Sequence, residues 1–260
     1  MNAMKRIGIV GTTLLAVLAL GLALPGKSQA ADVAVGAGLG AAPDYEGSED
    51  YIAVPIPFFS IRSDSGRFLE IAGNKLRANV LGSKMWAVGP YAQYIPKRGD
   101  VDNDRVDRMK NVDAAFMLGA FGQVKLGDFH LRLQGAQDVT DSNEGFLAQL
   151  GAGYTLPVSQ SFRMTFDAFT TYADDDYMST YFDVNRKDHN RSGLHRYDAD
   201  AGIKDVGLSL TTNCNPWEHW RFMGIVSYTR LTGDADDSPL VDDVGDPNQY
   251  FGGLVVIYQF

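Results

Sequence analysis

The sequence has a single cysteine, Cys214, so no disulfide can form within the chain. Basic residues are also scarce: 23 lysines and arginines stand against 32 aspartates and glutamates, which gives a formal net charge of −9. This sign disfavours a nucleic-acid partner. Beyond residue 24 there is no long apolar run, and therefore no transmembrane helix is predicted there. The fold must therefore be stabilised without disulfides or membrane-spanning helices after residue 24, and the residue pattern of the rest of the chain indicates how.

The first thirty residues have the three-part layout of a secretory signal peptide. Basic residues precede an apolar run over 7–24, helix breakers follow, and Ser28 and Ala30 supply small residues for a cleavage site. A membrane-anchoring helix is the alternative, because the run approaches the ~20 residues that span a bilayer. We predict a signal peptide at 1–30 and a single exported domain at 31–260.

From residue 31 onward, apolar and polar residues alternate, which is typical of β-strands with two different faces. In one segment Phe129, Leu131 and Leu133 alternate with His130 and Arg132. A soluble sandwich would show the same alternation. The segments, however, run about 11 to 15 residues, against ~5–6 in soluble sheets, and aromatic residues gather near their ends. Both features favour a transmembrane β-barrel.

The expected fold class is therefore all-β, a closed antiparallel transmembrane barrel. Long connections at 43–50, 98–111, 174–198 and 233–247 alternate with short turns, as in barrels with external loops and periplasmic turns. A hairpin at Gly73-Asn74 gives twelve strands, and ten is the alternative. The predicted strands are 32–42, 51–62, 67–72, 75–81, 85–97, 112–126, 129–139, 144–156, 161–173, 199–212, 219–232 and 248–260.

The polar faces of these strands carry both signs of charge. A selective channel more often displays one dominant sign, so we expect paired charges in a filled or very narrow lumen. The residues concerned are Asp113, Lys125, Arg132, Asp138, Arg163, Asp167, Asp200 and Lys204.

Two acidic loop segments are the candidate interaction sites. They could bind divalent cations loosely, together with lipopolysaccharide phosphates, but the favoured interpretation is a solvated loop whose charge discourages self-association. A calcium loop at 100–111 is rejected because Arg105 and Asn111 stand where glycine and glutamate are needed. No metal, cofactor or catalytic residue is predicted. The candidate residues are Asp174, Asp175, Asp176, Tyr177, Asp234, Asp236 and Asp237.

An embedded hydrolase is the enzyme alternative. His189 and His195 lie in the longest external loop, with Asp188 and Ser192 close in sequence. Closeness in sequence does not establish a nucleophile and base in hydrogen-bonding geometry, and no hydrolase signature is present. We therefore predict that the chain is not an enzyme.

Several motifs of the chain resemble the MipA/OmpV family. The resemblance is carried by residues 43–48 with Pro55 and Pro57, by 173–184 and 192–194, by 202–207 and 233–241, and by the closing strand from Asn248. It covers essentially the whole chain after residue 30. Asn213-Cys214-Asn215-Pro216, expected at a periplasmic turn, is a departure from the family pattern.

The resemblance implies an outer-membrane protein named for interaction with the lytic transglycosylase MltA. In that role the family is described as a scaffold between a murein hydrolase and a murein synthase, and no catalytic residue is carried over. A small porin-like channel and a surface adhesin or cation-binding barrel remain the alternatives. The other expected partners are outer-membrane lipid, lipopolysaccharide and the outer-membrane assembly machinery.

The last strand ends on aromatic residues, Tyr258 and Phe260. We interpret them as the signal that the assembly machinery reads. With twelve strands and a periplasmic start, Phe260 is expected at the periplasmic rim beside the first strand, near Asp32.

Overall fold

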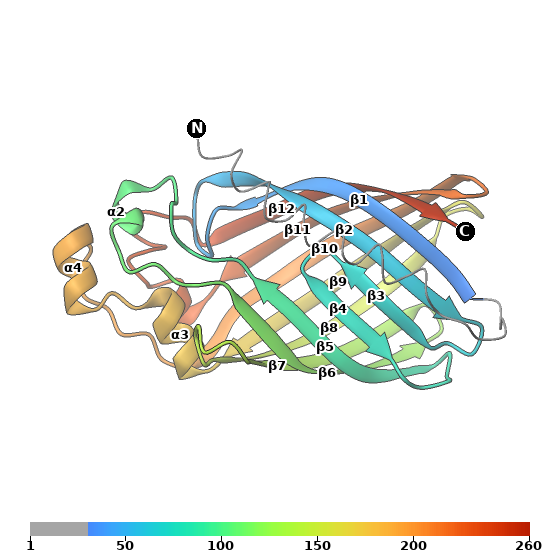
Figure 1. The fold of residues 1–260 in the computed structure, drawn as a ribbon, viewed down its shortest axis with the longest axis horizontal. Helices are drawn as coiled ribbons and strands as arrows, with labels where there is room; N and C mark the ends of the chain where they lie inside the picture. Colours follow the sequence, from blue (N-terminus) through green and yellow to red (C-terminus); the bar gives the residue numbers. More distant parts are fainter. Residues whose placement is uncertain (1–30) are drawn as a thin grey trace.

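The computed structural model describes residues 31–260, so the predicted signal peptide lies outside the described residues. The chain forms a closed antiparallel barrel of twelve strands, each paired with its neighbours in sequence, and the last pairs with the first (Figure 1). The fold class and strand number are as predicted. The strands are β1 (Ala31–Pro43), β2 (Tyr51–Ser63), β3 (Phe68–Ala72), β4 (Lys75–Asn79), β5 (Trp86–Ile95), β6 (Ala115–Leu126), β7 (Phe129–Asp138), β8 (Phe146–Pro157), β9 (Phe162–Ala173), β10 (Gly202–Trp217), β11 (Trp220–Leu231) and β12 (Asn248–Gln259).

The barrel is closed between β1 and β12. The backbone N–H of Phe260 donates to the carbonyl of Val33 over 2.9 Å, which places the carboxy terminus beside the start of β1 as expected. Small residues allow this close pairing. A Cβ at Gly38 would lie only 2.0 Å from the carbonyl oxygen of Leu254, so any larger residue there would push the two strands apart.

The predicted hairpin at Gly73-Asn74 is present. Gly73 has a positive φ of 60°, a conformation that glycine adopts without strain, and it joins β3 to β4. Both strands have only five residues, whereas β2 has 13 and β5 has 10. The hairpin therefore covers only part of the wall between its neighbours (Figure 1).

The periplasmic turn expected at Asn213 to Pro216 was wrongly placed. β10 continues through Cys214, which pairs with Phe222 on one side and Phe162 on the other, and the turn falls at residues 218–219. Pro216, which cannot donate a backbone hydrogen bond, lies where the register with β11 shifts between Cys214 and Trp217. A strand tolerates proline at such an irregularity.

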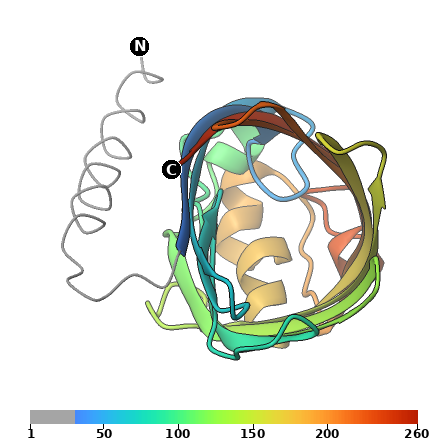
Figure 2. The ribbon, with the colours of Figure 1, turned by 90° about the vertical axis from the view of Figure 1, so that its right-hand side faces the viewer.

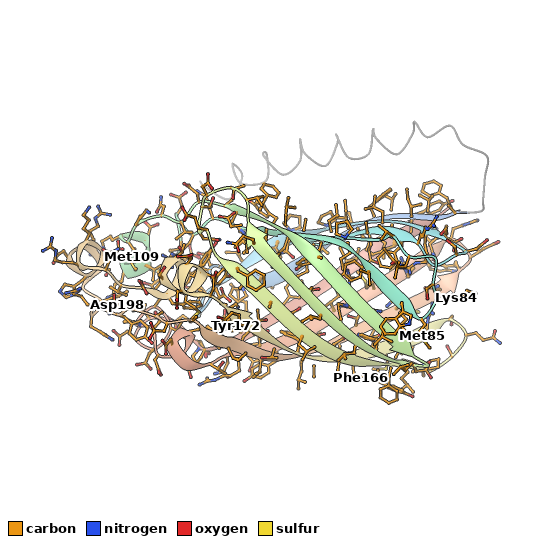
Figure 3. All side chains as sticks on the ribbon, turned by 90° about the horizontal axis from the view of Figure 1, so that it is seen from below. Lys84, Met85, Met109, Phe166, Tyr172 and Asp198 are labelled. Carbon is orange, nitrogen blue, oxygen red and sulfur yellow. The ribbon has the colours of Figure 1, made fainter. Side chains whose placement is uncertain are left out.

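Aromatic side chains ring both ends of the apolar outer surface, as at the two interfaces of a membrane barrel. Tyr172 points outward at the end of β9, and Phe166 points outward nearer the middle of the same strand (Figure 3). The ring nearest the short turns contains Trp86, Phe129, Trp217, Trp220 and Phe260, and the ring nearest the long loops contains Tyr51, Tyr94, Phe116, Tyr172 and Tyr250. Following the barrel rule, we call the short-turn end periplasmic and the other end external.

No helix within residues 31–260 is both long and apolar enough to cross a membrane.

Short helices cover the external end. The long connections, predicted as loops, contain α2 (Asp104–Asp107), α3 (Asp175–Phe182), α4 (Arg186–Ser192) and the 3₁₀ turn η1 (Gly233–Ala235). Viewed along the barrel from the periplasmic end, helical segments lie across the far mouth (Figure 2). We refer to residues 174–200 and 233–247 together as the external cap.

Candidate functional site

Three of the six acidic candidate residues accept hydrogen bonds from backbone N–H groups at the external end. Asp174 is the N-cap of α3: its carboxylate accepts hydrogen bonds from the backbone N–H groups of Tyr177 (3.1 Å) and Phe146 (2.8 Å). Asp175 accepts from the N–H of Ala201 over 2.7 Å. Asp176 is exposed to solvent in the first helical turn. A carboxylate at a helix N-terminus is also favoured by the helix dipole.

The second acidic segment is held in the same way. Asp234 accepts from the backbone N–H of Asp200 over 2.7 Å, and Asp236 forms an ion pair with Arg230 at 2.8 Å. Asp237 is exposed. Within residues 31–260 no group of three or more His, Cys, Asp or Glu side chains has an arrangement that could hold a metal ion.

Apolar side chains bring the two segments together. Tyr177 and Phe182 of α3 are buried with Ala235 and Val241 of the second segment, against Leu231 at the end of β11. Ser238 adds a hydrogen bond of 2.6 Å from its hydroxyl to the carbonyl of Phe182. The external cap is therefore a packed unit with its own core.

Tyr177 is the one predicted interaction residue that is buried. Its hydroxyl donates to Glu46 over 2.9 Å, and its ring packs at a tilt of 34° against that of Tyr181, with centroids 4.5 Å apart. Burial and the neighbouring carboxylate hold the pKa of Tyr177 well above that of a free tyrosine. Its hydroxyl therefore stays protonated and acts as a donor.

A buried charge network below Tyr177 was not predicted. The ammonium of Lys204 on β10 binds the carboxylate of Asp205 at 2.5 Å and that of Glu46 in the β1–β2 loop. It also lies 5.8 Å from the centre of the Tyr177 ring. The network joins loop, strand and helix at the external mouth. From the sequence, Lys204 was recognised only as one of the charges on the polar strand faces, and Glu46 only as part of a motif shared with the family. No sequence pattern predicted that the two side chains would meet.

The histidines considered for catalysis have other partners. His189 bonds through Nδ1 to the carbonyl of Leu194 at 2.6 Å, and His195 lies 3.3 Å from Asp243. The Ser192 hydroxyl donates to the backbone carbonyl of Asp188. The His189 and Ser192 contacts close the end of α4, and the His195 contact joins residue 195 to the 233–247 segment. None of them joins a serine to a histidine base.

The lumen contains two cavities, of about 400 and 340 Å³. Both are lined by Lys75, Gln134, Gln149 and Phe169, so the two cavities are neighbours in the lumen. Tyr177 and Tyr181 of α3 line the larger cavity, which therefore lies directly below the external cap.

The periplasmic end presents short turns and aromatic residues. Tyr258 packs edge-on against Trp220 and Phe260, with centroids 5.2 and 5.0 Å apart, and Phe260 is 75% exposed. The turn at residues 80–85 is the most apolar of these connections. Val80, Leu81 and Met85 are all exposed there beside Lys84.

Comparison with known proteins identifies the relationship. The family described as MltA-interacting protein MipA matches residues 35–260. The chain belongs to the MipA family. This agrees with the resemblance seen in the sequence, and with the closed barrel it makes the protein an outer-membrane barrel.

Two of the similar proteins are named as outer membrane proteins, and another is named for an interaction with MltA. The MltA-interacting protein of Escherichia coli K12 is 23% identical over 234 residues, which cover 88% of this chain and 94% of that protein. The outer membrane proteins Omp26La of Vibrio anguillarum and OmpV of Vibrio cholerae are each 25% identical over 162 residues. In both cases the match spans only 61% of this chain and 61% of the relative.

Among solved structures, the COG4313 outer membrane channel from Pseudomonas putida F1 is similar over 92% of this chain and 100% of that one. Its TM-score is 0.44 and its sequence identity 11%.

Proposed function

We propose that this protein is a non-enzymatic scaffold whose periplasmic end binds a lytic transglycosylase and holds it near a murein synthase. The observation that carries the proposal is the match to a protein named for interaction with MltA, which extends over 94% of that relative. A murein enzyme works in the periplasm, so its contact must lie on the periplasmic end of the barrel.

The turn at residues 80–85 is the part of this end best suited to a protein partner. Val80 and Met85 are 58% and 48% exposed, and Leu81 is exposed between them. Clustered exposed apolar side chains mark interaction sites in soluble surroundings. Lys84 and Met85 project from the periplasmic end in Figure 3. A standard interface buries ~800 Å² on each partner, so we expect the turns at 158–161 and 218–219 to contribute as well.

The external end favours a scaffold over an open diffusion pore. The helices and the buried cluster of Tyr177, Phe182, Leu231 and Val241 occupy the mouth through which solute would have to pass. Below them, the Lys204 network joins three elements. The protein would therefore act by binding partner proteins on its surface, and not by conducting solutes.

A pull-down tests the proposal. Purified barrel in detergent is immobilised and offered a purified lytic transglycosylase, and the triple variant Val80→Ser, Leu81→Ser, Met85→Ser is compared with the unmodified chain. We expect the variant to lose most of the captured enzyme. The matched control is Val139→Ser, which removes an apolar side chain of similar exposure (53%) from the external end.

Equal capture by the triple variant and the unmodified chain would exclude the 80–85 turn as the contact. Capture no greater than that of an unrelated barrel would exclude the scaffold itself.

A further inference from the structure

The wall of the barrel is incomplete between β2 and β5. β3 pairs only with Phe58–Arg62 of β2, and the last hydrogen bond at the hairpin tip runs from the N–H of Gly73 to the carbonyl of Pro57. Within residues 31–260, the first six residues of β2, 51–56, have a strand partner only on the β1 side. We call this region, between residues 51–56 and residues 94–98, the wall opening.

Pro55 and Pro57 are suited to the unpaired edge of β2. Backbone groups of alternate strand residues point to the same edge. The carbonyl of Pro57 faces the hairpin, so Pro55 faces the same edge just beyond the hairpin tip. Neither proline has an N–H, and proline in a sheet is confined to such edges. In lipid each unpaired backbone N–H costs several kcal/mol, so these prolines lower the cost of leaving the edge open.

The wall opening lies in the half of the barrel that faces the outer leaflet. Tyr51 and Tyr94, both in the external aromatic ring, stand on its two sides. The hairpin tip at Gly73-Asn74 bounds it towards the periplasm. Towards the exterior, the N–H of Asp102 donates to the carboxylate of Asp44 over 3.0 Å and joins the two loops above it.

The larger lumen cavity reaches the wall opening. Its lining includes Asn74 and Lys75 from the hairpin tip, Ile95 and Pro96 from the far side, and Pro43 from the end of β1. Tyr177 and Tyr181 of α3 line the cavity on the side of the external mouth, so a ligand would have to enter through the wall opening or move α3. A volume of about 400 Å³ falls at the small end of the usual range for ligand pockets.

Lys75 places a positive charge on the lining of the cavity. The other lysines and arginines on its lining have partners: Lys204 binds Glu46 and Asp205, Lys97 binds Asp100, and Arg98 donates to the carbonyl of Tyr181. Within residues 31–260 the ammonium of Lys75 forms neither an ion pair with a carboxylate nor a side-chain hydrogen bond. An enclosed ammonium without a counter-ion is unfavourable, so a bound anion would be stabilised here.

We propose that the wall opening is a lateral entrance from the outer leaflet and that the cavity binds a single-chain anionic amphiphile. Its carboxylate would lie against Lys75, and its alkyl chain would leave through the opening beside Ile56, Ile95 and Pro96. The site needs no murein partner, so the proposal is independent of the scaffold function.

Photolabelling tests this inference. The barrel in neutral maltoside detergent is labelled with a diazirine-bearing palmitate, and the adducts are mapped by mass spectrometry. We expect adducts on cavity and opening residues such as Ile56, Gln93 and Ile95, with competition by laurate. Acetate carries the carboxylate without an alkyl chain, and it should not compete. The uncharged detergent, present in excess, carries an alkyl chain without a carboxylate and controls for the alkyl chain alone.

The variants separate charge from shape. Lys75→Gln should lower the labelling of the cavity about tenfold or more, equivalent to loss of ~1.4 kcal/mol of binding free energy, whereas Lys75→Arg should retain it. Gln93→Trp, which fills the cavity and leaves Lys75 in place, should also abolish it. Lys187→Gln, an exposed position on α4, is the control. Each variant is first shown to be folded by its heat-modifiable migration.

Labelling that Lys75→Gln leaves unchanged, or adducts confined to lipid-facing residues such as Leu39 and Leu254, would overturn the proposal. If acetate competed as effectively as laurate, the proposal that the ligand is an amphiphile would be wrong, and the site would bind only small anions.

Discussion

Lys204 is the residue on which the external mouth depends most. Its ammonium neutralises two carboxylates that come from a loop and a strand, and all three side chains are largely shielded from water. Removing one partner from a buried ion pair leaves an uncompensated charge, at a cost of roughly 3–5 kcal/mol. We therefore expect Lys204→Ala to lower the free energy of unfolding by about that amount, measured by urea titration in detergent.

The control for this variant is Lys187→Ala on α4, where the side chain is exposed. It should unfold at the same urea concentration as the unmodified chain. Equal midpoints for both variants would show that the Lys204 network does not stabilise the mouth.

Asp183 gives the external cap a pH dependence of defined sign. Burial raises the pKa of its carboxyl, although the carboxylate accepts the N–H of Ala199 over 2.7 Å. Just above the ordinary aspartate pKa, the folded state therefore holds a proton that the unfolded state has released. The stability from this proton is present at low pH and is lost as the pH rises through the folded pKa.

Asp183→Asn keeps the hydrogen-bond acceptor and removes the titration. We expect the variant's unfolding midpoint to vary less across this acidic range, with Asp237→Asn, an exposed residue, as control. An unchanged pH profile in Asp183→Asn would mean that the carboxyl does not titrate abnormally.

At the scale of elements, closure of the barrel depends on the small residues of β1. The Cβ of Gly38→Ala would overlap the backbone of β12, because the nearest atom is a carbonyl oxygen at 2.0 Å. Overpacking of this kind costs about 1–3 kcal/mol. We expect a smaller fraction of heat-modifiable, folded barrel than with Gly252→Ala, where a Cβ meets nothing within 4 Å on the same seam. Equal folded fractions would contradict the need for glycine.

The strands were predictable because each carries its own pattern. In residues 248–260 the side chains at alternate positions share one strand face, which carries Tyr250, Leu254, Val256, Tyr258 and Phe260, and β12 occupies 248–259. The helix α3 was not predictable, because its eight residues begin with acidic side chains typical of a solvated loop. It is helical because Tyr177 and Phe182 pack on Leu231 and Val241, residues about fifty or more positions away. The Glu46–Lys204 pair has the same origin: only barrel closure brings the two residues together.

At the scale of the whole molecule, the two ends differ in what they can bind. The external end is a packed cap whose carboxylates mostly satisfy backbone N–H groups. The periplasmic end leaves apolar side chains exposed at residues 80–85. The sequence predicted that the long loops share one end of the barrel and the short turns the other. It could not show that Asp174, Asp175 and Asp234 accept hydrogen bonds from backbone N–H groups of and around the cap.

The central claim is that a murein enzyme binds the periplasmic end, and crosslinking in intact cells tests it most directly. A photoreactive amino acid is placed at Met85 in one strain and at Asp198 in another, positions at opposite ends of the barrel (Figure 3). The account predicts a covalent adduct with a lytic transglycosylase from Met85 and none from Asp198. Adducts from Asp198 alone, with Met85 silent, would contradict it.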